Sequence, residues 1–167
     1  MLAGDNNRGV YNASNNADQA ISYVCLGTSG HNKAYHISIL IFMLRADYDG
    51  NHSGDPDWAE RPNFFDHQCP DGMRAQVYFP SCWDGVNLDS ADHKSHMSYP
   101  IGQFNGGVCP SSHPKRLISL FYEYIIPTGD HPYHGAGSWS FSNGDQNGLR
   151  FHGASRPLLR RARLQPN

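Results

Sequence analysis

Two histidines three residues apart, His93 and His96, form the sharpest cluster of reactive side chains, and Asp92 stands directly before them. Histidines at this spacing lie on one face of a helical turn or converge from a tight loop, so both imidazoles can bind one metal ion. Asp92 could be a ligand or could fix a histidine tautomer. We therefore expect a divalent metal held by His93, His96 and His152, with Asp92 completing a catalytic group. The alternative is that these are loop histidines that satisfy turn backbone.

Several carboxylates could act as acid and base on a glycosidic bond. A glycoside hydrolase needs two carboxyl groups at a suitable separation. The candidates are Asp84, Asp89, Asp92 and Asp145. Asp is also favoured in turns, and Asp84 and Asp145 stand in Trp-Asp-Gly and Asn-Gly-Asp sequences. A turn role is therefore the alternative for each of them.

Aromatic side chains in the loops could stack on sugar rings, and the candidates are Trp58, Trp83, Tyr99 and Trp139. Such residues also serve as core or loop anchors in β-rich folds. For a substrate we expect contacts from Trp83, Asp84, Tyr99 and Asp145. The chain contains no Gly-rich phosphate loop, nucleophile elbow or HExxH sequence.

The elements that must position these groups are short strands joined by long loops. The chain has 167 residues, the size of one domain, with 17% charged residues, 17 Gly and 11 Pro. This composition is typical of a loop-rich β protein rather than a helical bundle. We predict a mainly β fold, sandwich-like or jelly-roll-like, with few short helices and its function on loops.

Four segments carry the strand predictions. Residues 20–26 are predicted to be a buried strand or the end of a helix capped near Asn16, and residues 75–79 a strand ended by Pro80. Residues 116–126 are the most apolar segment and are predicted to lie in the core. Residues 138–142 alternate as a short strand does.

Four cysteines, Cys25, Cys69, Cys82 and Cys109, are an even number at wide spacings, without the paired short spacings of a structural zinc site. Two disulfides are expected, and three pairings are open. We favour Cys82 with Cys109 because both stand in turn sequences rich in Pro and Gly, which leaves Cys25 with Cys69. The alternative is four free thiols in a cytosolic protein.

Signals for the cellular compartment point in two directions. Asn12 and Asn51 begin N-glycosylation sequences, which agree with secretion. The residues after Met1 are polar and form no signal peptide, so either the protein is cytosolic or its true N-terminus is missing. The net charge of -2 gives no general attraction to nucleic acid. Residues 37–44, the longest apolar stretch, are too short to span a membrane.

Long and unusual sequences make the chain resemble a known family. They are GDPDWAER, FFDHQCPDGMRAQVYFPSCWDGVNLDSADHKSHMSYP, CPSSHPKRLISLFYE and SFSNGD. The chain is similar to the fungal domain-of-unknown-function family numbered nineteen-ninety-six, over residues 1–26 and 47–153. The resemblance implies a secreted protein, often joined to WSC-type carbohydrate-binding modules, with no settled activity.

The chain departs from that family in three places. Members continue further at the N-terminus, with a signal peptide and a His-x-His motif, so residues 1–153 are expected to be the C-terminal portion of an incomplete domain. Residues 27–46 interrupt the family pattern without Asp, Glu or Pro, which suggests a retained intron; a genuine added helix is the alternative. Residues 154–167 carry four arginines and no acid, which suggests a frameshift. A real basic tail that contacts nucleic acid or a membrane surface is the alternative.

Three functions remain open from the sequence. The first is a secreted domain acting on cell-wall polysaccharide, as a metal-assisted hydrolase. The second is a non-catalytic module that binds glycans or the cell wall through loop aromatics. The third is a structural secreted surface protein whose histidines and carboxylates serve only in turns.

Overall fold

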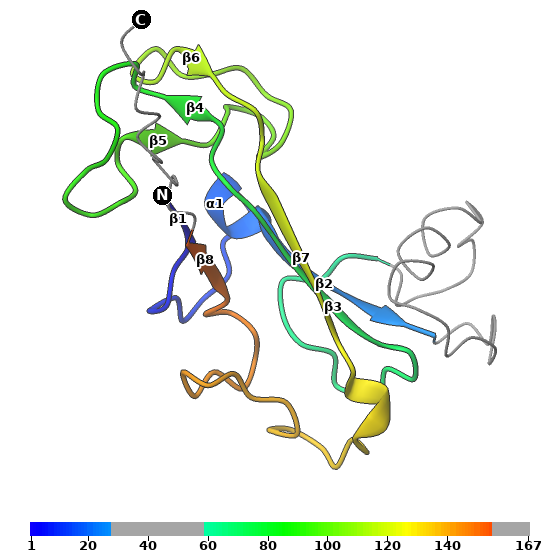
Figure 1. Cartoon of the computed structure of the whole chain (residues 1–167). Helices are drawn as coiled ribbons and strands as arrows, with labels where there is room; N and C mark the ends of the chain where they lie inside the picture. The colour runs from blue at the N-terminus through cyan, green and yellow to red at the C-terminus, as the bar shows by residue number, and fades with distance from the viewer. Residues whose placement is uncertain (28–58, 155–167) are drawn as a thin grey trace, which may run out of the picture.

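The computed structural model of the protein describes residues 1–27 and 59–154 (Figure 1). In chain order, the elements of these two ranges are β1 (Leu2–Gly4), α1 (Asn16–Gln19), β2 (Ile21–Leu26), β3 (Gly72–Tyr78), β4 (Cys82–Trp83), β5 (Met97–Ser98), β6 (Lys115–Arg116), β7 (Phe121–Ile126), η1 (Thr128–Asp130) and β8 (His152–Ala154). Strand accounts for 28% and helix for 6% of the described residues, so the mainly β class predicted from the sequence is confirmed. Asn51, Trp58, residues 28–46 of the expected insert and residues 155–167 of the expected tail lie outside the described residues.

A three-stranded antiparallel sheet in the order β2-β3-β7 forms the centre of the molecule. All six residues of β2 are buried. Its Tyr23 and Cys25 face a core built mainly from β3 and from loop aromatics such as Phe65 and Phe79. The apolar runs in β2 and β3 form strands because both can bury side chains against this core.

Two smaller sheets flank the central one. β4 pairs with β5 and with β6, and β1 pairs with β8 so that Leu2 lies opposite Ala154. Figure 1 shows β4, β5 and β6 gathered beyond one end of the central sheet, and η1 beyond the other end. Because these strands are only two or three residues long, long loops determine where most polar side chains lie.

The strand predictions for residues 20–26 and 75–79 are confirmed by β2 and β3. Residues 20–26 contain β2, which follows the single helical turn α1. The side chain of Asn15, one residue before the predicted cap, accepts a hydrogen bond from the Ala17 N–H at 3.0 Å and caps that turn. Residues 75–78 fall within β3, which ends at Tyr78, and Phe79 separates the strand from Pro80.

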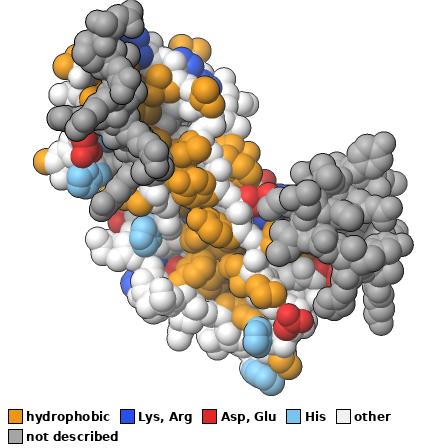
Figure 2. Space-filling view, viewed as in Figure 1, with side chains coloured by type: hydrophobic (Ala, Val, Ile, Leu, Met, Phe, Trp, Pro, Cys, Tyr) orange, Lys and Arg blue, Asp and Glu red, His pale blue; other side chains and the backbone are white. Residues whose placement is uncertain are grey.

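The two remaining strand predictions are wrong in part. In the segment 116–126, Arg116 ends β6 and Phe121–Ile126 form β7. β7 lies at the sheet's edge, and Tyr124 is 51% exposed. Ile118, which precedes it, is 95% exposed. Figure 2 shows hydrophobic side chains in a band that follows β7 over this face. Residues 138–142 form a loop, because Phe141 bonds through its N–H to the Asp145 carbonyl instead of to a strand.

The two outer edges of the central sheet differ. On the β2 side, Tyr23 exchanges two backbone hydrogen bonds with Arg61, at 2.8 and 2.9 Å. On the β7 side, the residues Phe121–Ile126 pair with β3 and with no further strand in the described parts of the chain. Within the described ranges, one edge is therefore paired at Tyr23 and the other is open along its length.

Two disulfides connect the loops to the sheets. Cys25 of β2 is bonded to Cys69, and Cys82 of β4 to Cys109, the same pairing that the sequence favoured. Both bonds fit a secreted protein. In the described ranges, no helix has the length and apolar character needed to cross a membrane.

Candidate functional site

The loop between β4 and β5 carries Asp92, His93 and His96, and its path is fixed by Asp92. The Oδ1 atom of Asp92 accepts hydrogen bonds from the Ser95 and Lys94 backbone N–H groups, at 2.9 and 3.0 Å, and from two serine hydroxyls. These bonds hold the pKa of Asp92 well below its ordinary value, and the bond from the Ser95 N–H contributes most. Asp92 is thus an ionised acceptor that organises the turn through Oδ1.

His93 points its imidazole at Asp89 rather than at Asp92. Its Nδ1 lies 2.8 Å from both carboxylate oxygens of Asp89, and this bond is the main reason that the pKa of Asp89 is lowered. The backbone of His93 has a φ of 55°, a left-handed value that residues other than glycine seldom take. Its carbonyl accepts the Leu2 N–H at 2.9 Å, which holds the loop against β1.

His96 is buried, with 5% of its surface exposed, and is held by Ser90. The Ser90 hydroxyl donates to Asp92 at 2.7 Å, so its oxygen is left to accept from His96 Nδ1 at 2.8 Å. This network places the His96 proton on Nδ1 and leaves Nε2 with a free lone pair. His93 is in the same tautomer, since its Nδ1–H donates to a carboxylate. Neither Nε2 has a hydrogen-bond partner among the described residues.

His152, the expected third ligand, lies in the same region without joining the two other histidines. It pairs with Gly4 in the β1–β8 sheet, and the Gly4 carbonyl accepts a bond from Lys94 Nζ at 2.8 Å. Its own Nδ1 bonds to the Arg150 carbonyl at 2.9 Å. Among the described residues, no three ligand atoms from His93, His96 and His152 lie within 4.8 Å of one another.

The side chains of Asp84 and Trp83 organise the start of the same loop. Asp84 accepts the backbone N–H groups of Val86 and Asn87, at 2.9 and 3.0 Å, and the first of these bonds contributes most to its lowered pKa. Trp83 donates its indole N–H to the Asn87 carbonyl at 2.6 Å. His113, absent from the sequence predictions, bonds to the Ser95 carbonyl at 3.0 Å. It stands seventeen residues after His96 and had no local spacing signal.

The other expected carbohydrate contacts lie in different surroundings. Asp145 is buried, and its carboxylate accepts three backbone N–H groups of its own loop. Trp139 packs against the core, and its buried indole nitrogen has no hydrogen-bond partner among the described residues. Tyr99 donates its hydroxyl to the Tyr78 carbonyl at 2.7 Å, and burial raises its pKa.

A groove open to solvent lies beside α1 and contains Tyr99. Its volume is about 650 Å³, and its lining is Ser14, Asn15, Asn16, Ala17, Gln19, Ser98, Tyr99, Pro100, Ile101, Gly102 and Pro110. We call it the α1 groove. A second hollow of about 320 Å³ shares Asn15, Ala17, Ser98 and Tyr99 with it and reaches β1 and Lys94. The Asn16 amide donates to the Pro100 carbonyl at 2.5 Å, so the two walls of the groove are tied together.

The exposed residue Asn12 stands in the loop before the α1 groove. Its side-chain oxygen accepts the Ser14 N–H at 2.9 Å, which makes a compact turn of the glycosylation sequence. Asn12 is therefore accessible at the surface, as a glycosylated residue must be.

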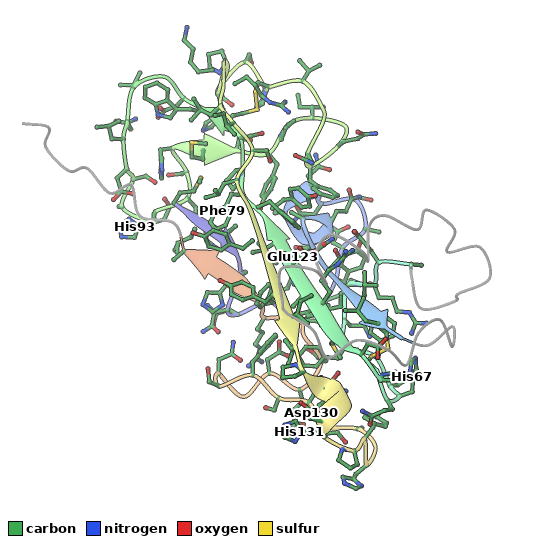
Figure 3. The ribbon with its side chains drawn as sticks, turned by 45° about the vertical axis from the view of Figure 1, so that its right-hand side comes forward. His67, Phe79, His93, Glu123, Asp130 and His131 are labelled. Atoms are coloured by element: carbon green, nitrogen blue, oxygen red, sulfur yellow. A yellow bond between two sulfur atoms is a disulfide. The ribbon has the colours of Figure 1, made fainter. Side chains whose placement is uncertain are left out.

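Figure 3 shows His93 beside the β1–β8 sheet and His67, Asp130 and His131 at the far end of the molecule. The histidines of the described ranges therefore form separate groups. No curated protein and no solved structure matches the chain. A family model does match: the one described as a domain of unknown function (DUF1996) covers residues 1–154, and the chain belongs to this family.

Proposed function

We propose that this domain is an extracellular glycan-binding module and that the α1 groove holds the sugar chain. The observation that carries the proposal is the lining of the groove. Amides from Asn15, Asn16 and Gln19 and hydroxyls from Ser14 and Ser98 surround it, beside apolar surface from its Pro and Ile residues. Uncharged donors and acceptors next to apolar patches suit the hydroxyls and ring faces of sugars.

The state of the four carboxylates expected from the sequence favours binding over hydrolysis. A glycosidase needs a general acid whose pKa is raised toward neutrality. Asp84, Asp89 and Asp92 all have lowered pKa values, because backbone or histidine groups donate hydrogen bonds to them. They stay ionised at neutral pH, and the buried Asp145 is occupied by its own loop.

An extracellular location is supported by two features of the described residues. The cysteines are joined in two disulfides with none left free, as is common in secreted domains. Asn12 presents a glycosylation sequence on an exposed loop. A glycan partner is available in that compartment.

The test blocks the α1 groove and compares the variant with a matched control. Ala17 lines both hollows, so Ala17→Arg fills them with a long side chain, whereas Ala13→Arg adds the same charge outside them. In affinity electrophoresis against glucan, chitin and mannan, we expect Ala17→Arg to weaken retention by about tenfold or more. Ala13→Arg keeps wild-type retention.

Equal melting temperatures show that both variants are folded. Equal retention of the two variants, or no retention of the wild type by any of the polysaccharides, contradicts the proposal. If the protein releases soluble reducing sugar from a polysaccharide that retains it, the domain is a hydrolase and not a binding module.

A second candidate function is binding of a divalent metal by His93 and His96. It is favoured by the fixed tautomers, because Asp89 and Ser90 hold the two Nδ1 protons and leave both Nε2 atoms as donors to a metal. Elemental analysis of the wild type against His93→Ala/His96→Ala tests it. Unchanged metal content removes this candidate, whereas Asp89→Asn is expected to weaken binding about tenfold.

A further inference from the structure

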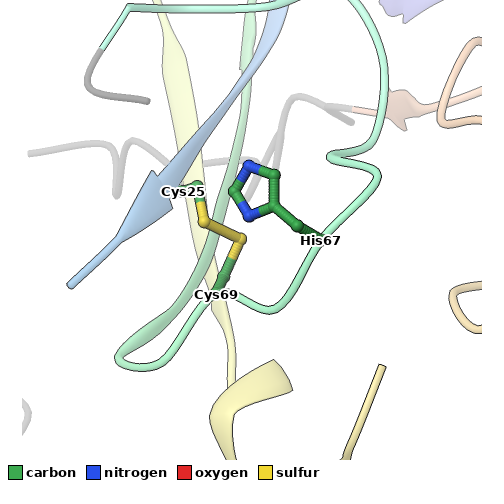
Figure 4. A group of neighbouring side chains, drawn as sticks. All are labelled: Cys25, His67 and Cys69. Carbon is green, nitrogen blue, oxygen red and sulfur yellow. A yellow bond between two sulfur atoms is a disulfide. The ribbon is translucent and has the colours of Figure 1, made fainter. Parts of the chain in front are cut away.

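Cys25, His67 and Cys69 bring three metal-binding side chains together at the end of the central sheet. One ligand atom from each, two sulfurs and an imidazole nitrogen, all lie within 4.8 Å of one another. Figure 4 shows the imidazole ring facing the disulfide bond that joins the two cysteines. Figure 3 places His67 at the opposite side of the molecule from His93, so this cluster is separate from the β4–β5 loop.

The backbone around the cluster is held by contacts other than the disulfide. Cys25 is fixed in β2 opposite Met73 of β3. The loop that carries His67 and Cys69 is held through Gln68, whose side chain donates to the Thr128 carbonyl at 2.8 Å and accepts the Tyr133 N–H at 2.7 Å. The three ligand-bearing residues therefore have supports that do not depend on the sulfur–sulfur bond.

We propose that reduction of the Cys25–Cys69 disulfide by a thiol or phosphine converts this cluster into a site for a thiophilic divalent cation such as Zn²⁺. Reduction breaks the sulfur–sulfur bond and adds two electrons and two protons, while two reductant thiols join as a disulfide or the phosphine becomes its oxide. The cation then displaces both thiol protons to solvent and forms two bonds to sulfur and one to the His67 imidazole. Water takes the fourth position.

The geometry suits a tetrahedral ion. Bonds of about 2.3 Å to sulfur and about 2.0 Å to nitrogen separate the ligand atoms by roughly 3.5–3.8 Å. The three ligand atoms already lie within 4.8 Å. The two sulfurs must part by less than about 2 Å from their bonded distance, which rotation of the cysteine side chains provides. Both cysteines are fully buried and His67 is partly buried.

The other disulfide supplies an internal control. In the described parts of the chain, Cys82 and Cys109 have no histidine or carboxylate that completes a set of three ligand atoms. Reduction of that pair gives two thiols without the imidazole. The proposed selectivity therefore depends on His67.

The experiment is a cobalt titration of the phosphine-reduced protein. We expect one Co²⁺ per chain with a thiolate-to-cobalt charge-transfer band, and displacement of that ion by Zn²⁺. The oxidised protein gives no such band. His67→Ala, reduced in the same way, is expected to bind Co²⁺ at least about tenfold more weakly, since losing even an outer-shell partner weakens metal sites this much.

The controls separate this site from other thiols and from the other histidines. Cys82→Ala/Cys109→Ala keeps the band at wild-type affinity. An unfolded chain could bind Co²⁺ through its four thiols, but that binding does not depend on His67. Equal affinity of His67→Ala and the wild type therefore overturns the proposal, and so does a reduced protein that gives no band. Binding through His93 or His96 gives no thiolate band and does not require the reductant.

Discussion

Removing the carboxylate of Asp145 tests whether this buried acid is a structural acceptor or a ligand contact. Its Oδ1 accepts the N–H groups of Asn147 and Gly148, at 3.1 and 3.2 Å, and its Oδ2 accepts that of Arg150 at 2.7 Å. Only 4% of Asp145 is exposed. Asp145→Ala leaves three N–H donors of the loop without this partner.

The expected loss of stability follows from those three bonds. A hydrogen bond to a charged group contributes roughly 1.5–3 kcal/mol. The sum overstates the loss, because the loop can relax and the substitution removes the desolvation cost of a buried carboxylate. We expect Asp145→Ala to lower the free energy of unfolding by about 3 kcal/mol. Asp145→Asn keeps the Oδ1 acceptor and loses only the bond from Arg150, so its loss is about 1–2 kcal/mol.

Urea unfolding of the three proteins, followed by tryptophan fluorescence, measures these differences. The midpoint should fall in the order wild type, Asp145→Asn, Asp145→Ala, with an unchanged dependence on urea. Glycan retention of the folded variants should equal that of the wild type. If Asp145→Ala unfolds at the wild-type urea concentration but loses glycan retention, the carboxylate contacts the ligand and the structural reasoning is refuted.

Three further predictions concern other buried or paired groups. Tyr23→Phe removes the 2.7 Å bond from the phenol to the Gly148 carbonyl, so the free energy of unfolding in urea should fall by about 1–2 kcal/mol. An unchanged urea midpoint contradicts this. Cys82→Ala/Cys109→Ala opens a loop with a separation of 27 residues, so thermal unfolding should show that the free energy of unfolding falls by roughly 3–4 kcal/mol. A smaller loss would indicate residual structure in the unfolded chain. Asp92 has a lowered pKa in the folded state, so its contribution to stability is present above the unfolded pKa of about 3.9 and is lost as pH falls through the folded pKa. The melting temperature of the wild type should therefore fall more than that of Asp92→Asn between about pH 5 and pH 2, and parallel curves would exclude this role.

The strands of the central sheet could be predicted from the sequence where local pattern and burial agree. β2 is apolar along its length, and it is buried along its length. The segment leading into β7 is equally apolar, yet Ile118 is 95% exposed and Tyr124 51% exposed. Apolar character alone cannot distinguish a buried strand from a partly exposed one, because burial depends on what packs against each strand in the folded sheet.

The candidate site could be predicted less fully, because its geometry depends on one loop conformation. The spacing of His93 and His96 is visible in the sequence. Their partners Asp89 and Ser90 are set by the turn that Asp92 organises and by the left-handed backbone of His93. The cluster of Cys25 and Cys69 with His67 shows the same limit, since β2 and the loop before β3 meet only in the folded sheet.

The difference between the two edges of the central sheet has a consequence for association. Arg61 pairs with Tyr23 on the β2 side, while the described chain leaves the β7 side without a neighbouring strand. Within the described residues, β7 is therefore the edge of this sheet that has no pairing beyond β3. If the β7 strands of two molecules pair with each other, each strand covers the open edge of the other. Such a symmetric contact closes on itself and gives a pair rather than a filament.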